Sequence, residues 1–401
     1  MTVLELTTGP VGHGGFCVAR HEGRVVFVRH ALPGERVRAV VTEDRGGSYC
    51  RADAVAVLEP ATSRVPSRCP VAGPGGCGGC DFQHVDPEAQ RRLKAQVVAE
   101  QLRRIAGLDV EVIVHELPGG PLGWRTRTRL AVDPTGRPGF RVHRSHEVLP
   151  VPACPLAVPG SLDPVLAHSW QPGGELEVVA DDSGQVHVTQ VGPHRAPIQL
   201  RGTGRAVWHA AGRRWDLSSL GFWQVHPAAA DALAALVGDW AAAPQGGLAW
   251  DLYGGVGLFA SVLAGQVGPD GSVTVVETSR GAVADGQAAL ADLSQVRFVT
   301  GRVERALAAA GTPELPGNPD VVVLDPPRRG AGREVATAVA GRGPARIVHL
   351  SCDPAALARD LAAYLHGGYR LRELRALDAF PMTHHVECVA LLTPPETPTP
   401  P

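Results

Sequence analysis

Two side chains late in the chain have the chemistry of a nucleophile and a base. Cys352 stands in HLSCDP, where a strand-like run ends and Pro354 opens a helix-like run. A thiolate is a soft nucleophile suited to conjugate addition, and we expect the helix N-terminus to lower its pKa. Glu387 stands in the apolar run VECVALL, with His384 and His385 nearby. An ionised carboxylate is costly there, which favours a base in a partly buried site. The alternative interpretations are a structural thiol and a solvated strand end.

A glycine-rich turn and an acidic residue have the spacing of a nucleotide site. DLYGGVG, residues 251–257, follows a strand-like run, and Glu277 ends the next such run 22 residues after Gly255. Glycines let the backbone approach a ligand, and a carboxylate there can accept hydrogen bonds from ribose hydroxyls. The pattern also fits a tight turn without a ligand. It does not separate nicotinamide cofactors from S-adenosylmethionine.

The sequence DPPR, residues 325–328, adds a later acidic position. Asp325 ends the run VVVLD, which puts it at the carboxyl edge of the sheet, where open α/β sheets bind ligands. The two prolines remove N–H donors and stiffen the backbone, so carbonyl groups left free there could hold a planar base or the cofactor. A dehydrogenase has no need of this motif after a late strand, and the motif therefore favours methyl transfer.

Four cysteines have the spacing of a metal site. Cys69, Cys77 and Cys80 lie in a loop rich in proline and glycine, and Cys154 follows after a long gap. A C-x2-C pair with two further cysteines suits tetrahedral zinc or an iron–sulfur cluster, and spacing alone does not decide between them. The gap closes if the central part of the chain folds back.

Three parts of the chain must position these residues. Residues 1–59 hold short strand-like runs, which predict a small β-barrel of the oligonucleotide-binding kind. Residues 60–220 join the cysteine loop to a helix that ends at Gly107 and to strands such as DVEVIVHEL, which predicts a mixed or antiparallel α+β domain. Residues 221–393 alternate strands and helices, which predicts an α/β fold with a doubly wound, mostly parallel sheet. Residues 394–401 form a proline-rich tail that we expect to be disordered.

Composition excludes several classes of protein. The chain is 44% hydrophobic but has no unbroken apolar stretch of about 18 residues, so we expect no membrane span. The first residues lack a secretory signal, which predicts a cytoplasmic protein. The net charge is −2, yet the segment 125–144 is rich in arginine and could bind phosphate, although a solvated face is equally compatible. These arginines are Arg125, Arg127, Arg129, Arg137, Arg141 and Arg144.

Several motifs, taken in order, resemble the RNA uracil-C5 methyltransferase family. DLYGGVG, DPPR, LSCDPAALARDL and FPMTHHVECVALL resemble the family's catalytic motifs, and GFWQVHP resembles its FxQVN segment. Residues 1–59 resemble a TRAM domain. CGGCDFQH resembles the family's iron–sulfur loop, and SHEVLPVPACPL resembles the segment that carries its fourth cysteine. The resemblance covers nearly the whole chain and implies a Rossmann-like methyltransferase domain.

The resemblance also implies roles for individual residues. Cys352 would attack C6 of a uracil, and Glu387 would remove the C5 proton after methyl transfer. Such a target base must leave its stack. The partner would be ribosomal or transfer RNA, with ribosomal RNA favoured, and we expect a monomer that binds no membrane. The residues that would bind S-adenosylmethionine are Gln224, Tyr253, Glu277 and Asp325. A [4Fe–4S] cluster, with zinc as the alternative, would be held by Cys69, Cys77, Cys80 and Cys154.

Some positions depart from the family pattern. Leu258 replaces an asparagine, SCNP reads SCDP, FPQT reads FPMT at Met382, and the asparagine of FxQVN is His226. Three alternatives stay open: a cytosine-C5 methyltransferase, a non-catalytic RNA-binding or assembly factor that keeps the fold, and a nicotinamide enzyme. Glu387, placed after Cys352 in the chain, favours the uracil reaction.

Overall fold

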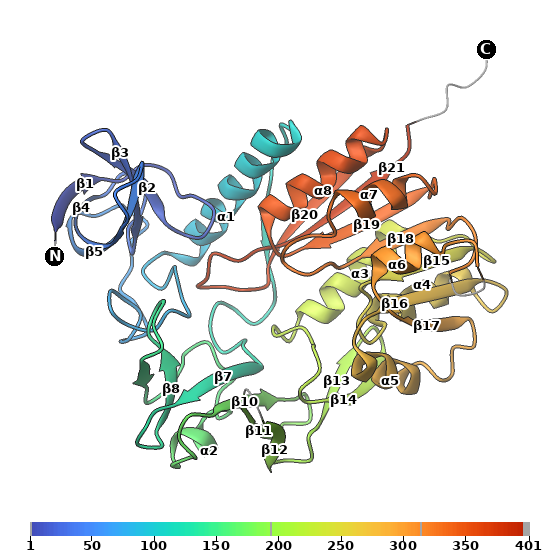
Figure 1. Cartoon of the computed structure of the whole chain (residues 1–401), viewed down its shortest axis with the longest axis horizontal. Helices are drawn as coiled ribbons and strands as arrows, with labels where there is room; N and C mark the ends of the chain where they lie inside the picture. Colours follow the sequence, from blue (N-terminus) through green and yellow to red (C-terminus); the bar gives the residue numbers. More distant parts are fainter. Residues whose placement is uncertain (1, 193–194, 313–314, 396–401) are drawn as a thin grey trace.

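A computed structural model describes residues 2–192, 195–312 and 315–395. Figure 1 shows three parts of the molecule: an N-terminal barrel at the left, a central sheet at the bottom and a C-terminal α/β domain at the right. Helix α1 (Pro87–Gln101) lies between the barrel and the C-terminal domain. Most of the predicted tail, residues 396–401, lies outside the described residues.

The N-terminal part is the predicted small β-barrel. Its strands pair in the order β1-β4-β5-β3-β2, with β3 and β5 parallel and the other pairs antiparallel. Beyond β1, the Gly9 N–H donates to Val18 O at 2.7 Å, and Val11 pairs with Cys17, so the sheet closes on itself. This order is typical of a five-stranded oligonucleotide-binding barrel. The strands are β1 Val3–Thr7, β2 Cys17–His21, β3 Arg24–Arg29, β4 Arg36–Asp44 and β5 Tyr49–Glu59.

Helix α1 begins where the sequence supplies a cap and a proline. The Asp86 carboxylate accepts hydrogen bonds from the N–H groups of Glu88 and Ala89, and Pro87 is the first helical residue. The helix continues as a π-helical turn, η1 (Leu102–Ala106), and ends at Gly107, whose φ is 66°. The predicted end of this helix is therefore confirmed.

The central part forms an antiparallel sheet in the order β12-β11-β10-β7-β8-β9. Its core contains Leu130, Leu176, Val178 and Val188, which alternate with polar residues along the strands. A separate hairpin of β13 and β14 connects it to the C-terminal domain. The elements are β7 Arg127–Val132, β8 Pro138–Arg141, β9 Val148–Pro150, α2 Asp163–Leu166, β10 Glu175–Ala180, β11 Val186–Gly192, β12 Arg195–Arg201, β13 Arg205–Ala210 and β14 Arg213–Ser218.

The C-terminal part is a Rossmann-like doubly wound sheet in the order β17-β16-β15-β18-β19-β21-β20-β6. The first five strands of this order run parallel, and β21 runs antiparallel to both of its neighbours. The predicted parallel sheet is confirmed. Its strands are β15 Leu248–Leu252, β16 Ser272–Glu277, β17 Val296–Thr300, β18 Val321–Leu324, β19 Arg346–Ser351, β20 Arg370–Asp378 and β21 Glu387–Thr393.

Helices cover both faces of this sheet. In β18, Val321 and Val323 join a core with α3 and α4, whereas Val322 and Leu324 join a second core with α7 and α8. A strand buried on both faces needs no polar alternation, which explains the sequence VVVL. The helices are α3 Ala229–Ala241, α4 Leu258–Val267, α5 Arg280–Ala289, α6 Val303–Ala308, α7 Arg333–Ala340 and α8 Pro354–His366.

One predicted strand belongs to a different sheet from the one expected. The run DVEVIVHEL forms only the short strand β6 (Val114–Glu116), which pairs in parallel with β20 instead of joining the central sheet. Val114 is buried in the same core as Leu102 of η1. Among the described residues, no helix is long and apolar enough to cross a membrane.

Candidate active site and nucleic-acid cleft

The two predicted reactive side chains lie at the ends of neighbouring strands. β19 and β21 are antiparallel, and Ser351 stands opposite Cys388. One step further, the same register places Cys352 opposite Glu387, where facing Cβ atoms lie about 5 Å apart. Cys352 is half-buried and Glu387 is 6% exposed. A small planar ring that entered from the solvent side could therefore contact both groups at once.

Burial and the charges around Cys352 disfavour ionisation of its thiol. Burial and the nearby carboxylates of Glu387 and Asp325 raise the pKa of Cys352 to about 12, while Arg328 acts in the opposite direction. The expectation that the helix N-terminus lowers this pKa is wrong here. The Asp353 carboxylate caps α8 by accepting from the Ala356 N–H at 2.8 Å, and burial is the largest cause of the raised pKa of Cys352.

Asp325 lies at the carboxyl end of β18, next to the point where the strand order reverses between β15 and β18. Burial raises the pKa of Asp325 to about 7. Burial, followed by the charges of Asp325 and Glu277, raises the pKa of the fully buried Asp251 to about 8. Burial and Asp325 also raise the pKa of Glu387 well above its ordinary value. Closely spaced carboxyl groups at this edge therefore disfavour one another's ionisation. A bound cation or proton would relieve this repulsion, and perturbed pKa values of this kind gather at functional sites.

The glycine-rich turn is held by Glu277. One Glu277 oxygen accepts from the Gly255 N–H at 3.1 Å, and the other accepts from the Ser279 N–H at 2.6 Å. Tyr253 adopts a φ of 59°, a conformation that non-glycine residues rarely take. A side chain at Gly254 would come within 2.6 Å of Val275, so the sharp turn requires glycine there. Tyr253 and Glu277 are thus brought to the same sheet edge as Asp325 and Cys352.

The turn offers an unsatisfied polar atom of the kind that a ligand or water satisfies. Asp251 Oδ2 accepts from the Ala260 N–H at 2.9 Å, while Oδ1 is buried without a hydrogen-bond partner. Gln224 is half-buried in the segment before α3. The carbonyl of its neighbour Val225 accepts two 3.0 Å hydrogen bonds from Thr126 of the central domain. The carboxylates, the glycine turn and a nearby amide are compatible with a nucleoside cofactor.

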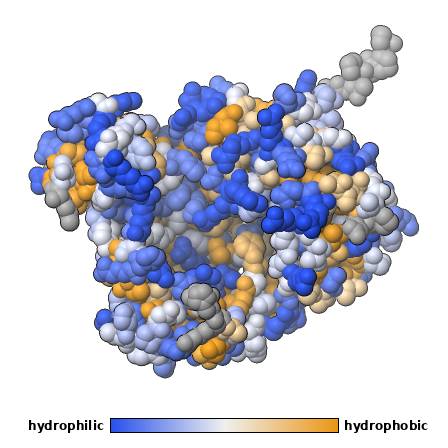
Figure 2. Space-filling view, viewed as in Figure 1, coloured by the Kyte–Doolittle hydropathy of each residue, from blue (hydrophilic) through white to orange (hydrophobic). Residues whose placement is uncertain are grey.

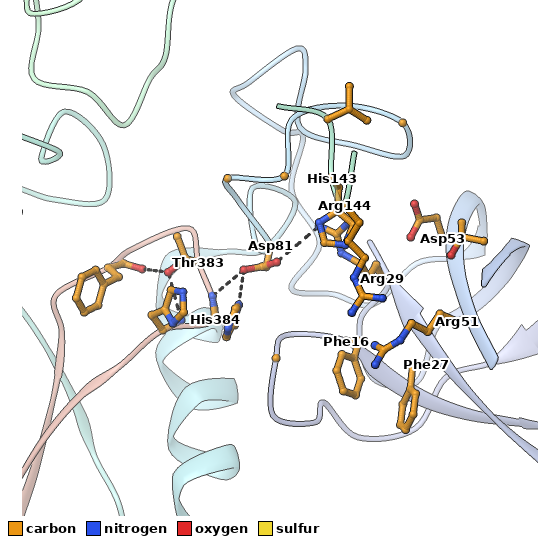
Figure 3. Close-up of a pocket in the computed structure, with 18 of the residues that line it drawn as sticks. Phe16, Phe27, Arg29, Arg51, Asp53, Asp81, His143, Arg144, Thr383 and His384 are labelled. Atoms are coloured by element: carbon orange, nitrogen blue, oxygen red, sulfur yellow. Dashed lines mark hydrogen bonds and ion pairs between the residues drawn. The ribbon is translucent and has the colours of Figure 1, made fainter. Parts of the chain in front are cut away.

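A cleft of about 1030 Å³ lies between the barrel, the cysteine loop, the central sheet and the C-terminal loop 380–385. Figure 2 shows this face of the molecule hollowed where the three parts meet. Figure 3 shows side chains from all of them pointing into the cleft. A lining of arginines attracts phosphate. Five arginines from distant parts of the chain line this cleft: Arg29, Arg51, Arg125, Arg144 and Arg328.

Aromatic rings lie on the barrel side of the cleft. The Arg51 guanidinium lies 5.9 Å from the Phe16 ring and 5.6 Å from the Phe27 ring, and the two ring centroids are 4.7 Å apart. Tyr49, beside Phe27 at 5.4 Å, is 46% exposed. Partly exposed rings next to arginine form a surface on which unpaired bases stack.

Most arginines of the predicted basic patch form ion pairs with carboxylates of the same domain. Arg127 and Arg129 bind Glu177, Arg141 binds Glu175, and Arg137 binds Asp133. Of the six arginines, Arg125 and Arg144 line the cleft, and Arg144 is also paired with Glu43 of the barrel at 2.7 Å. The basic surface is therefore assembled from several domains and not from one segment.

The four cysteines of the predicted metal site line one small cavity. β7, β8 and β9 fold back so that Cys154 faces the loop of Cys69, Cys77 and Cys80 across a space of about 20 Å³. The Gly79 N–H donates to Cys77 Sγ at 3.4 Å. Over the described ranges, no group of three or more cysteine, histidine or acidic residues is arranged to hold a metal ion. The thiol donor set suits a metal centre, but its ligand geometry is not formed in this structure.

Some residues important to the site were missed at the sequence level. Asp360 of α8 accepts from the N–H groups of Ala331 at 2.7 Å and Gly332 at 2.9 Å, and so anchors the loop after DPPR. Lys94 is buried on the inner face of α1 and binds Asp378. Charged residues among apolar helix neighbours are the signal that could have identified both.

Comparison with known proteins first defines the class. The family model for the TRAM domain matches residues 2–55. The crystal structure of Pyrococcus abyssi tRNA (uracil-54, C5)-methyltransferase in complex with S-adenosyl-L-homocysteine aligns with a TM-score of 0.72 at 20% identity. The alignment covers 97% of this chain and 100% of that chain. The fold is thus a TRAM barrel joined to a Rossmann-like methyltransferase domain.

Sequence relatives define the family. The family model described as tRNA (Uracil-5-)-methyltransferase matches residues 318–394. An uncharacterized RNA methyltransferase of Streptomyces avermitilis is 47% identical, with 97% of this chain and 98% of the relative covered. The 23S rRNA (uracil(1939)-C(5))-methyltransferase RlmD of Alkalilimnicola ehrlichii is 35% identical, with 97% and 96% covered. The chain belongs to the family of S-adenosylmethionine-dependent RNA (uracil-C5)-methyltransferases.

Proposed function

We propose that this enzyme methylates C5 of a uridine in ribosomal RNA through a covalent bond between Cys352 and C6 of the base. The observation that carries the proposal is the register of β19 and β21, in which Ser351 stands opposite Cys388, so that Cys352 and Glu387 are the next residues to face each other. The carboxylates of Glu387 and Asp325 are close enough to affect the Cys352 thiol. The reaction needs a thiolate and a base on one ring, and this strand pair supplies both.

The proposed sequence of bond changes follows from the poor nucleophilicity of uracil C5. Once the Cys352 thiol has lost its proton to solvent, the thiolate adds to C6 and leaves an enolate. The C5 carbon of this enolate would take the methyl group as the bond from that methyl to the sulfonium sulfur breaks and a neutral thioether leaves. Glu387 then accepts the C5 proton, the enolate reforms, and the C–S bond breaks to release thiolate and product. The target uridine must be flipped out of its stack to reach the two groups.

S-adenosylmethionine supplies an electrophilic methyl group when it is bound. We propose that Gln224, Tyr253, Glu277 and Asp325 hold it, because the last three lie at the edge where the strand order reverses. Glu277 would accept from the ribose hydroxyls. Asp325 and Glu387 carry raised pKa values that a nearby positive charge would lower again. The same charge would lower the pKa of the Cys352 thiol.

We propose a [4Fe–4S] cluster on Cys69, Cys77, Cys80 and Cys154, with zinc as the alternative. The four thiols face one cavity, and an amide donates to one sulfur, as is common where thiolates hold a cluster. Its role would be structural or in contact with RNA, because methyl transfer needs no electrons. Protein purified without oxygen should be brown and contain iron and labile sulfide. Colourless protein with one zinc per chain contradicts the cluster.

Ribosomal RNA is favoured over transfer RNA by the relatives. The relative named for 23S ribosomal RNA is 35% identical along nearly the whole chain, whereas the transfer-RNA enzyme shares only the fold at 20% identity. Such a substrate agrees with the expected cytoplasmic location, and we propose that the enzyme acts as a monomer. The cleft supports RNA binding through its arginines and the rings of Phe16 and Phe27.

Two measurements test the proposed function. Nucleoside mass spectrometry of RNA from a deletion strain, mapped to position, should lack one 5-methyluridine in ribosomal RNA. Cys352→Ala should abolish methylation while leaving S-adenosylmethionine binding nearly unchanged, since Cys352 attacks the base and not the cofactor. Methylation of RNA by this variant contradicts the mechanism. Loss of 5-methylcytidine would instead identify the cytosine reaction, and no change in either would favour an assembly factor.

A further inference from the structure

The loop of residues 379–386 connects β20, which ends at Asp378, to β21 and leads directly into Glu387. A segment roughly 290 residues earlier in the chain, Asp81–Lys94, contacts this loop at three points. That segment begins immediately after Cys80 and includes the first half of α1. The loop is therefore held by another part of the chain and not only by its own strands.

The first contact is made by a buried lysine. Lys94 is 2% exposed and donates from Nζ to Asp378 Oδ1 at 2.6 Å and to the Phe380 carbonyl at 3.0 Å. A buried charge of this kind persists only with a buried partner, and here the partner is the last residue of β20. This contact fixes the start of the loop.

The second contact is centred on Met382. Gln90 is 1% exposed; its Oε1 accepts from the Met382 N–H at 2.9 Å, and its Nε2 donates to the Val85 carbonyl at 2.9 Å. The N–H groups of Asp81 and Phe82 both donate to the Met382 carbonyl at 3.0 Å. Every backbone hydrogen-bonding group of Met382 is thus satisfied by the Asp81–Lys94 segment.

Met382 needs such support because its backbone is strained. Its φ is 64°, in the left-handed region that a side chain with a β-carbon disfavours. Such conformations persist only where the surroundings impose them, and they gather at functional sites. Release of the Gln90 contact would let this turn relax, and Glu387 follows five residues later.

The third contact is the one nearest to Glu387 along the chain, at His384. Asp81 Oδ2 accepts from the His384 N–H at 3.1 Å and is 2.6 Å from His384 Nδ1. Arg29 of the barrel approaches the other Asp81 oxygen at 3.7 Å. Figure 3 shows Asp81 between these groups at the wall of the cleft. Thr383 Oγ1 donates to the Phe380 carbonyl at 2.8 Å and completes the turn.

We infer that the Asp81–Lys94 segment positions Glu387 and thereby sets the rate of proton removal from C5. Asp81, Gln90 and Lys94 are positioning residues that act through the loop and do not touch the base. Cys352 follows the last residue of β19 and precedes the capped start of α8. Phe82, Leu93 and Lys94 line a small cavity together with Cys352, but the three contacts described above are made to the loop and not to Cys352. The inference rests on the proposed function, because it assigns a step of that reaction.

The test compares two glutamines on the same helix. Gln90→Met removes both hydrogen-bonding functions at nearly constant size, and Gln96→Met makes the same change at an exposed position. Both variants are tested as full chains purified without oxygen. For each, we would measure the single-turnover rate of covalent adduct formation with RNA, the turnover rate, the KM for S-adenosylmethionine and the melting temperature.

Gln90→Met should form the adduct at close to the normal rate but release product about ten- to a hundredfold more slowly, because misplacing a catalytic group by about 1 Å has effects of that size. Adduct should therefore accumulate, with KM unchanged, and Gln96→Met should behave as wild type. In a Glu387→Gln background, Gln90→Met should have little further effect on the rate of product release, since both changes act through the side chain at position 387.

Other outcomes separate the two proposals. Wild type that forms no adduct with RNA and cofactor contradicts the proposed function itself. Active wild type with a folded Gln90→Met variant that releases product normally overturns the inference. Equal slowing of adduct formation and release would also overturn it, because that result indicates a general structural role. If Gln90→Met does not fold, Asp81→Asn replaces it under the same criteria.

Discussion

Replacing Glu387 by glutamine should trap the enzyme on its RNA. Glutamine keeps the shape of the side chain but cannot accept a proton at neutral pH. Thiolate addition and methyl transfer both precede removal of the C5 proton, so these steps should proceed. Elimination of Cys352 cannot, because the enolate must reform before the C–S bond breaks. The methylated adduct is therefore the species expected to accumulate.

The size of the effect follows from the surroundings of Glu387. A positioned general base contributes about 10²- to 10⁴-fold, or roughly 3–5.5 kcal/mol at 1.36 kcal/mol per factor of ten. Glu387 is only 6% exposed, so a base from bulk solvent reaches the site poorly. We therefore expect product release to slow by about 10³-fold or more.

The dependence on pH gives a second signature. Burial and Asp325 raise the pKa of Glu387, and the group must be ionised to accept a proton. Wild-type turnover should thus fall as pH drops through this raised pKa, because the base becomes protonated. Glu387→Gln lacks the titrating group, so its slow release should not show that acid limb.

The assay is a denaturing gel of enzyme mixed with labelled RNA. Glu387→Gln should give a shifted band that survives denaturation and that requires both S-adenosylmethionine and an intact Cys352. Cys352→Ala in the same background is the control and should give no band. Ordinary turnover without a band refutes the assignment of the base. An inactive variant without a band would place Glu387 in binding or folding.

Three further predictions concern the barrel. Glu35 is fully buried and binds Arg64 and the Leu32 N–H, so Glu35→Gln should destabilise the protein by about 3 kcal/mol in urea unfolding, and a change under about 0.5 kcal/mol would contradict this. The bond to Asp353 at 3.0 Å raises the pKa of His13, so the pair should stabilise the fold below pH about 6.5 and lose this effect as pH rises through the raised pKa. Thermal melts of His13→Ala should therefore differ from wild type at pH 6 and converge at high pH; a constant difference would exclude the pair as the cause. Phe27→Ala should weaken RNA binding by about 1–3 kcal/mol with cofactor affinity unchanged, and equal RNA affinity in a binding titration would remove the stacking role.

Much of the fold could be predicted from local patterns. The run VVVL could be recognised as a strand buried on both faces, and Gly107 marked a helix end. The motifs around Asp325 and Cys352 follow parallel strands, and the carboxyl ends of such strands meet at one edge. These features are set by residues close in sequence, so the sequence alone determined them.

Other features were decided only by tertiary structure. The strand β6 joins the C-terminal sheet, although the pattern of its sequence predicted a strand of the central domain. The pKa of Cys352 is raised and not lowered, because burial and the carboxylates of Glu387 and Asp325 disfavour the thiolate. Most arginines of the predicted patch meet carboxylates such as Glu177 on a neighbouring strand.

The loop before Glu387 shows why these features escape sequence analysis. The N–H of Met382 in its strained turn donates to Gln90, 292 residues away, and Asp378, the strand residue before the loop, is paired with Lys94. Neither partner belongs to a local repeat or motif. The sequence predicted which residues would act as nucleophile and base. The packing of distant segments determined where those residues lie and which charges they feel, because burial and Coulomb interactions depend on distance in space and not on distance along the chain.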